Sequence, residues 1–302
     1  MTEPRVRTPS VLEETDLHYV WTRDFEPAKY CSPYILATEK PAVIDTGTGA
    51  NWETILDALT ELGIEPEMLS AIILTHVHLD HAGGAGYLAD ACPNADIFVH
   101  HRGATHLVDP ERLWEGTTAA VGEQIQNYAT PHPIPTDRIV ELDAGDRIDL
   151  GDRELLVHPA PGHAFHQVVY EDLSGGGVFT GDAAGIKTPG VDRVQPSSPP
   201  PDFDLEASLE DIEMIESLSA SVLYLGHFGP QGPEKVLEEY RTVLSDWVEA
   251  VAEKRDAVGA DEAVAYFAEQ TETGGAWGAL KAREEARMNV RGVLTFLGES
   301  QS

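Results

Sequence analysis

Four potential metal ligands within six residues constrain this chain more than any other feature of its sequence. His76, His78, Asp80 and His81 come directly after residues 71–74, a continuous apolar run that is typical of a buried strand. Side chains two residues apart on an extended segment point to the same side, so we expect the first two histidines to lie together and a turn to bring Asp80 and His81 into the same cleft. Imidazole and carboxylate groups are ligands that Zn²⁺ and similar metals prefer. The pattern predicts a metal site rather than a solvated histidine-rich loop.

The charge of the chain is strongly unbalanced. Its 302 residues include 20 Lys and Arg against 52 Asp and Glu, which gives a formal net charge of −32. Nucleic acids and anionic membranes bind basic surfaces, so we expect neither as a partner. Above about 1 M salt the screening length falls to roughly 3 Å, and a high net charge is then tolerated. We interpret the acidity as adaptation to a salty cytoplasm, with an ordinary acidic protein as the alternative.

The remaining bulk properties predict a soluble, cytoplasmic protein. Cys31 and Cys92 make no disulfide framework, and we expect both to be buried, reduced thiols. Residues 1–10 have no apolar stretch after their charges, so we expect no signal peptide, and no apolar run has the length of a transmembrane helix. The sequence leaves open whether the protein forms a homo-oligomer.

Short β-branched or aromatic runs alternate with amphipathic segments over the first three quarters of the chain. We expect strands over residues 32–37, 42–44, 71–74, 97–99 and 222–225, five more short strands between 139 and 180, and helices over 51–62, 111–128 and 205–218. Residues 186–204 are rich in Pro and Ser and have little periodicity. A loop of that length in a compact domain is often functional, and we expect it to form a wall of the active site.

From residue 233 onward the pattern is helical throughout. We expect helices over residues 235–253, 261–269 and 276–297, with a break at Thr273-Gly274-Gly275 between the last two. The chain therefore divides into residues 1–232 and a C-terminal α-helical region of residues 233–302. This region is either an appendage or a small subdomain that folds back over the site.

Four more short motifs occur in order along the chain, each at the end of a predicted strand. They are Ile44-Asp45-Thr46-Gly47, Ala160-Pro161-Gly162-His163, Thr180-Gly181-Asp182 and Leu225-Gly226-His227. Together with the HxHxDH cluster they make the sequence similar to the metallo-β-lactamase fold superfamily, from about residue 19 to residue 229. The resemblance implies an α/β (α+β) fold, a four-layer αββα sandwich, followed here by the C-terminal helical appendage.

The same resemblance implies ligands for two divalent metal ions. One ion would be held by His76, His78 and His163. The other would be held by Asp80, His81 and His227, and Asp182 would bridge the two. No ligand position is missing or substituted. We expect Zn, with Fe and Mn left open because all three metals accept nitrogen and oxygen ligands.

Two further residues have supporting roles by resemblance. Asp45 would support the metal-binding loop through hydrogen bonds without being a ligand. His166 follows His163 by three residues, as in the PGHxxH pattern of glyoxalase II-like members. We expect it to line the pocket or to hold a ligand in place, and the alternative is a packing histidine.

The resemblance implies a metal-dependent hydrolase similar to glyoxalase II, acting on a small-molecule substrate that is an ester, a thioester or a lactone. Two metals roughly 3.5–4 Å apart can share a hydroxide formed near neutral pH, and Asp80 would orient it and shuttle a proton. Flavodiiron proteins have the pattern HxExDH, with a glutamate as the second ligand of the motif. In this sequence His78 occupies that position. The alternatives that stay open are an iron-dependent redox member, such as a persulfide dioxygenase-like enzyme, and a metal-binding module without turnover. The use of glutathione is also left open.

Overall fold

The structure is a computed structural model, and it describes residues 6–7, 16–22, 30–271 and 278–298. The predicted break at residues 273–275 and the first two residues of the last predicted helix lie outside this part of the chain. No helix of the described part is long and apolar enough to span a membrane. Cys31 and Cys92 are free and buried, as expected.

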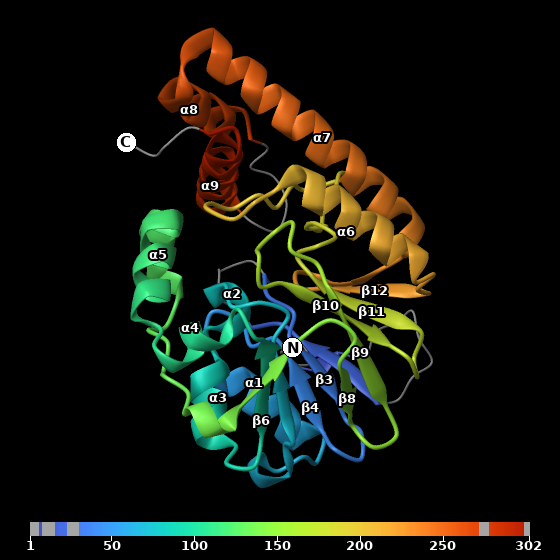
Figure 1. Cartoon of the computed structure of the whole chain (residues 1–302). Helices are drawn as coiled ribbons and strands as arrows, with labels where there is room; N and C mark the ends of the chain where they lie inside the picture. Colours follow the sequence, from blue (N-terminus) through green and yellow to red (C-terminus); the bar gives the residue numbers. More distant parts are fainter. Residues whose placement is uncertain (1–5, 8–15, 23–29, 272–277, 299–302) are drawn as a thin grey trace.

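Two mixed β-sheets form the centre of the molecule (Figure 1). The first contains seven strands in chain order, β1 (Val6–Arg7), β2 (Leu17–Val20), β3 (Tyr34–Leu36), β4 (Ala42–Ile44), β5 (Ala71–Ile73), β6 (Asp96–His100) and β7 (Ile139–Leu142). Pairing is antiparallel from β1 to β4 and parallel from β4 to β7. The second sheet has the order β13 (Gly229–Gln231), β12 (Val222–Leu225), β11 (Gly177–Gly181), β10 (Val168–Asp172), β9 (Glu154–Pro159) and β8 (Arg147–Asp149). Only the β11–β12 pair of that sheet is parallel.

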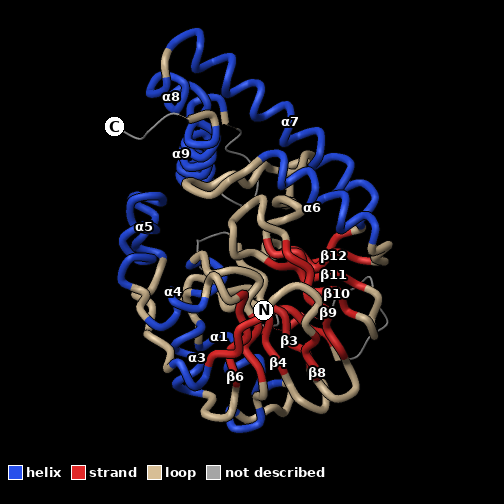
Figure 2. The backbone as a smooth tube through the Cα atoms, viewed as in Figure 1, coloured by secondary structure: helices blue, strands red, loops and turns tan. Residues whose placement is uncertain are grey.

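Helices cover the outer face of each sheet, and Figure 2 shows the strands between two groups of helices. Helices α1 (Glu53–Glu61) and α3 (Ala85–Ala91) share a core with the first sheet, and α6 (Leu205–Ser217), α7 (Pro233–Val258) and α9 (Gly278–Phe296) share one with the second. A third core, which includes Tyr34, Ile44 and Tyr170, lies between the sheets. Both faces of the central strands are therefore buried, which explains their continuous apolar runs. The four-layer αββα sandwich predicted from the sequence is confirmed.

The remaining elements are short, apart from two helices. They are α2 (Leu79–Ala82), α4 (Ala104–Val108), α5 (Glu111–Val121), α8 (Ala260–Gln270) and the 3₁₀ turns Pro66–Met68, Gly122–Asn127 and Thr136–Arg138. The helix expected over residues 111–128 ends early because Gly122 adopts a φ of +58°, which the α-helix cannot continue, and a 3₁₀ turn follows. Five strands between residues 139 and 181 agree with the prediction, whereas β1, β2 and β13 were not foreseen.

The C-terminal helices pack on the sandwich. Buried residues of α7 and α9 belong to the same core as strands β10, β11 and β12. Helix α9 also contacts α5, and in Figure 1 the lower end of α9 lies near the upper end of α5. The region after residue 232 therefore folds back on the rest of the chain. Its separation as a domain stays a prediction.

Candidate metal centre

The ends of four strands supply the histidines and aspartates singled out in the sequence. His76 and His78 follow β5, and α2 begins at once and carries Asp80 and His81 in its single turn. The connection from β9 to β10 contributes His163. Strands β11 and β12 are parallel neighbours, so the residues that follow them, Asp182 and His227, meet at one edge of the second sheet. The structure brings all seven predicted ligands together.

The seven side chains form two groups of three with one carboxylate between them. Ligand atoms of His76, His78 and His163 lie within 4.8 Å of one another, and so do those of Asp80, His81 and His227. In the first group, His78 Nδ1 is 3.0 Å from His163 Nε2. In the second group, His227 Nε2 is 3.7 Å from Asp80 Oδ2. The two groups coincide with the two ligand sets implied by the sequence resemblance.

Asp182 lies between the two groups. Its Oδ1 is 3.3 Å from His81 Nε2 and 3.2 Å from His227 Nε2, and its Oδ2 is 3.7 Å from His163 Nε2. The carboxylate thus faces one histidine of the first group and two of the second, as expected of a bridging group.

Four buried polar atoms at this centre make no hydrogen bond of acceptable geometry with the described residues, although three of them lie close to one another. They are the Nε2 atoms of His76, His81 and His227 and the Oδ1 atom of Asp182. Leaving one such atom unsatisfied typically costs about 1–3 kcal/mol, so four at one place need an explanation. Imidazole nitrogens and carboxylate oxygens are suited to Zn²⁺, Fe²⁺ and Mn²⁺. These residues fit a pair of bound cations.

The electrostatics of the first group also favour metal binding. Burial, followed by the neighbouring His81, holds the pKa of His76 well below its ordinary value. Burial and the nearby His163 lower the pKa of His78 to about 4. These two imidazoles are therefore neutral at pH 7, and a neutral imidazole is the form that binds a metal.

The second group and the carboxylate of Asp182 between the groups carry the charge of the centre. Burial lowers the pKa of His81, but the carboxylates of Asp182 and Asp45 outweigh it and hold that pKa well above the ordinary value. Burial raises the pKa of Asp182, but His227 and His81 outweigh it and hold that pKa well below the usual range. Without a cation, protonated His81 compensates the buried carboxylates. A metal ion would take over this role and displace the proton.

Asp45 supports the centre from behind. It has a φ of +57°, and its carboxylate accepts hydrogen bonds from Thr75 N at 2.9 Å, from Thr75 Oγ1 at 2.8 Å and from His81 Nδ1 at 2.9 Å. A proton fixed on Nδ1 turns the Nε2 lone pair of His81 toward the metal centre. Asp45 belongs to none of the potential ligand groups. This arrangement matches the supporting role that the resemblance implies.

Ser197 was not singled out by the sequence. Its Oγ donates to Asp182 Oδ2 at 2.9 Å and lies 3.2 Å from His163 Nδ1, from which it can accept a hydrogen bond. One hydroxyl therefore orients two potential ligands. Only its place in the Pro- and Ser-rich segment 186–204, expected as a wall of the site, hinted at a role.

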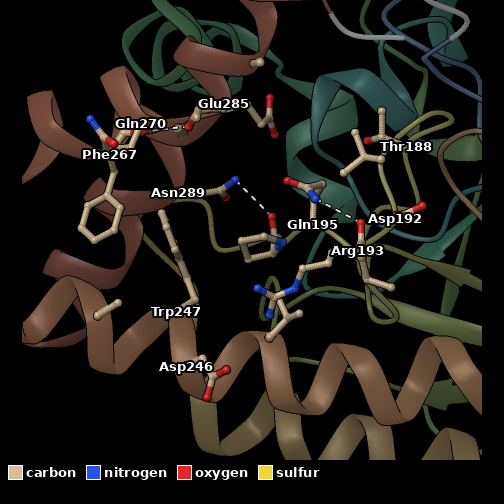
Figure 3. Close-up of a pocket in the computed structure, with 18 of the residues that line it drawn as sticks. Thr188, Asp192, Arg193, Gln195, Asp246, Trp247, Phe267, Gln270, Glu285 and Asn289 are labelled. Atoms are coloured by element: carbon tan, nitrogen blue, oxygen red, sulfur yellow. Dashed lines mark hydrogen bonds between the residues drawn. The ribbon is translucent and has the colours of Figure 1, made fainter. Parts of the chain in front are cut away.

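Two C-terminal helices hold the segment that carries Ser197. Asn289 of α9 accepts a hydrogen bond from Ser198 N at 2.7 Å through Oδ1 and donates to Pro196 O at 3.1 Å through Nδ2. Trp247 of α7 donates from Nε1 to Ser198 Oγ at 3.1 Å. Figure 3 shows Asn289 and Trp247 beside this segment, where both residues line a pocket of about 690 Å³. The geometry of the metal centre thus depends on helices that lie well beyond it in the sequence.

Tyr30 is the second residue that sequence reasoning missed. Its hydroxyl donates to Asp80 Oδ2 at 3.3 Å, and its carbonyl oxygen lies 3.3 Å from His227 Nδ1. Its ring stacks on the His227 imidazole with 4.0 Å between centroids. Burial, and then the carboxylate of Glu285, raises the pKa of Tyr30, so its hydroxyl stays protonated. No local motif marks this tyrosine.

A cavity of about 340 Å³ opens onto the metal centre. Asp80, His163 and Asp182 line it, and so does His166, which is buried. Burial and the neighbouring His78 lower the pKa of His166 to about 2, so this imidazole is neutral. Residues of the segment 197–202 and helix α9 supply further walls, so the Pro- and Ser-rich loop and the C-terminal region both line the site, as expected.

Comparison with known proteins agrees with this architecture. A family model described as the metallo-beta-lactamase superfamily matches residues 28–227. A metallo-beta-lactamase family protein from Thermus thermophilus has a similar structure, with a TM-score of 0.72, 24% sequence identity, and coverage of 94% of this chain and 93% of that one. At that identity the likeness concerns the fold.

Three curated relatives are similar over shorter stretches. A metallo-beta-lactamase fold-containing protein of Sulfurisphaera tokodaii is 26% identical over 236 residues, which cover 76% of this chain and 84% of the relative. A hydroxyacylglutathione hydrolase of Synechococcus sp. is 29% identical over 145 residues, 48% of this chain and 44% of that protein. An acyl-coenzyme A thioesterase of Gallus gallus is 28% identical over 180 residues, 55% of this chain and 62% of the thioesterase.

Proposed function

Because the chain belongs to the metallo-beta-lactamase superfamily, we propose that it is a hydrolase that holds two divalent metal ions and cleaves an ester, a thioester or a lactone. The observation that carries this proposal is the convergence of seven nitrogen and oxygen ligands, with four buried atoms that make no hydrogen bond of acceptable geometry among the described residues. The two distant relatives named as a hydroxyacylglutathione hydrolase and an acyl-coenzyme A thioesterase support the thioester among these substrates. A small molecule is the substrate class that a cavity of about 340 Å³ accepts.

The ligand sets follow the two groups seen in the structure. His76, His78 and His163 would hold one ion, and Asp80, His81 and His227 would hold the other, with Asp182 between them. When bound, such ions lower the pKa of water to near 7 and polarise a carbonyl group. We propose Zn as the metal, and Fe and Mn suit the same ligands.

Asp80 is the residue to which we assign proton transfer. Burial raises its pKa, but His81 and His227 outweigh this and keep the pKa below the ordinary value, so Asp80 begins as a carboxylate. Its side chain lines the cavity and is 18% exposed, against 6% for Asp182. The protonated hydroxyl of Tyr30 donates to Oδ2 and fixes its orientation. Asp80 can therefore take up a proton at a point that substrate reaches.

Metal analysis combined with an activity panel tests the proposal. The purified protein is assayed by elemental mass spectrometry, and a panel of thioesters, esters and lactones is screened at low and high salt. We expect two metal ions per chain and hydrolysis of at least one class. His76→Ala should remove one ion and most of the activity, because it deletes a buried ligand of the first group.

His132→Ala is the matched control. His132 is exposed, stacks on Tyr87 and pairs with Asp90, outside the metal centre. This variant should keep both the metal content and the activity. A protein that binds no metal, or full activity in His76→Ala, would overturn the proposal. Bound iron together with thiol oxidation, and no hydrolysis, would identify the redox alternative.

A further inference from the structure

We propose that the cavity at the metal centre binds an apolar acyl chain of medium length, and that the chain lies along helix α5. This inference rests on the proposed hydrolase function and concerns the part of the substrate that is not cleaved. It assigns a substrate-binding role to α5, an element that carries none of the predicted site residues.

Helix α5 turns an unusual face toward the cavity. Leu113, Gly116, Thr117 and Ala120 line the cavity, and their spacing of three and four residues places them on one side of the helix. Only Val121, at the end of α5, is buried. Leu113 packs in part against the core of the first sheet, whereas Gly116 is exposed, so the middle of this helix faces the cavity.

Gly116 is the centre of that face. Glycine is the least favourable residue in a helix interior after proline, so its presence in the middle of α5 needs a local reason. A Cβ atom built at Gly116 would meet no atom within 4 Å. The missing side chain leaves open space along the helix, which suits a ligand that lies flat against it.

The opposite wall combines apolar side chains with an ion pair. Pro199, Pro200 and Pro201 line it together with Met288 of α9. Lys281 and Glu285 of α9 line the cavity too, but they form an ion pair with each other at 2.5 Å, with both side chains nearly buried. Their charges offset each other; Arg112 of α5 and Asp202 also line the cavity, so the slot between α5 and α9 is largely but not wholly apolar.

The inner end of the slot reaches the proposed reacting groups. Asp80 and Asp182 line the same cavity as α5. The Asp182 side chain is 6% exposed, and its Oδ1 makes no hydrogen bond of acceptable geometry in the described part of the chain. The cavity volume of about 340 Å³ is near the lower end of the roughly 300–1,000 Å³ that hold drug-sized ligands. An acyl chain of medium length fits, with its carbonyl at the metal centre.

The test compares two thioesters, acetyl- and octanoyl-N-acetylcysteamine, on the metal-loaded protein. Each buried methylene should raise kcat/KM by up to about fourfold, so we expect at least a tenfold preference for the octanoyl probe. Gly116→Leu puts a side chain into this open space, where its Cβ meets no atom within 4 Å, and should lower this preference about tenfold. Since leucine also favours helix, the variant should fold, which circular dichroism checks.

Ala119→Leu is the matched control on the same helix. Ala119 is exposed and does not line the cavity, so this variant should keep the wild-type preference. Binding of octanoate, measured by calorimetry, adds a readout that needs no turnover, and Gly116→Leu should weaken it at least tenfold. Hydrolysis of both probes without preference, or an unchanged preference in Gly116→Leu, would overturn the acyl slot and leave the hydrolase proposal standing. Octanoate binding that Gly116→Leu weakens, without hydrolysis of any substrate, would keep the slot and reject the hydrolase.

Discussion

Asp45→Asn is the substitution that tests most directly how the metal centre is supported. Asparagine has the same shape as aspartate and tolerates the left-handed backbone of this position, where φ is +57°. The change therefore removes a charge and one acceptor oxygen while keeping the loop. In the wild type that oxygen accepts from His81 Nδ1 at 2.9 Å, in a pair whose side chains are 1% and 7% exposed.

The introduced amide allows two hydrogen-bonding states of His81, and both are unfavourable for metal binding. Either its Nδ1 proton loses its acceptor, or the imidazole changes tautomer, accepts from the new amide group and then carries a proton on Nε2, where it can no longer bind a metal. A buried hydrogen bond to a charged group contributes about 1.5–3 kcal/mol, against about 0.5–1.5 kcal/mol for a neutral one. Loss of such a partner behind a ligand lowers metal affinity by roughly 10–100-fold, or about 1.4–2.7 kcal/mol, which is the same range.

The assay is a competition titration of Zn²⁺ with a chelator, resolved into a first and a second ion. We expect the ion held by Asp80, His81 and His227 to weaken by the stated factor and the other ion to change less. Asp90→Asn is the control, because Asp90 makes a similar bond of 3.0 Å to His132 at the surface, where the side chains of His132 and Asp90 are 45% and 68% exposed. Metal affinities of Asp45→Asn within twofold of the wild type would refute the reasoning.

Four further predictions follow from the same structure. Ser197→Ala should lower metal affinity at least fivefold by freeing Asp182 and His163, whereas Ser197→Thr should restore most of it; equal affinities in both variants would contradict the role of the hydroxyl. Burial raises the pKa of Asp211 to about 7, so the folded protein keeps a proton that the unfolded chain releases; stability should fall by up to about 4 kcal/mol as pH rises from about 4 to about 7. Asp211→Asn should lose that dependence in urea titrations and keep the bond from Gly162 N. Removal of metal by a chelator should lower the unfolding free energy by about 4 kcal/mol where free metal stands at a thousand times its Kd, and a melting curve that does not move would count against tight binding. If the net charge of −32 reflects a salty cytoplasm, the urea midpoint should drop on transfer from about 2 M to about 0.1 M KCl; a midpoint independent of salt would favour an ordinary acidic protein.

Most of the sandwich could be predicted from local patterns. The strands β4, β5 and β12 are continuous apolar runs, and their bounds agree with the prediction to within one residue. The strands β1 and β13 carry no such pattern, since β1 has two residues and β13 begins at a glycine and contains a proline. They form because each pairs with the edge of a neighbouring strand. The sequence of a short strand does not specify its pairing partner.

The ligands of the centre belong to the part that sequence determines. Each one stands shortly after the end of a strand or in the first turn of a helix, and that local position fixes the direction of the side chain once the strand is in its sheet. Parallel pairing of β4 with β5 brings Asp45 beside the histidines that follow β5, and parallel pairing of β11 with β12 brings Asp182 beside His227, whereas the packing of one sheet on the other joins the two sets.

Tertiary structure alone decided the surroundings of that centre. Tyr30 reaches Asp80 across 50 residues of chain, and Asn289 holds Ser198 across 91. The proposed acyl slot depends on how α5 and α9 pack, which no single segment encodes. The chemistry of the ligands is local because metal binding needs a few atoms at fixed angles from rigid strand ends. The surrounding cavity is non-local because it is the space that separately packed helices leave between them.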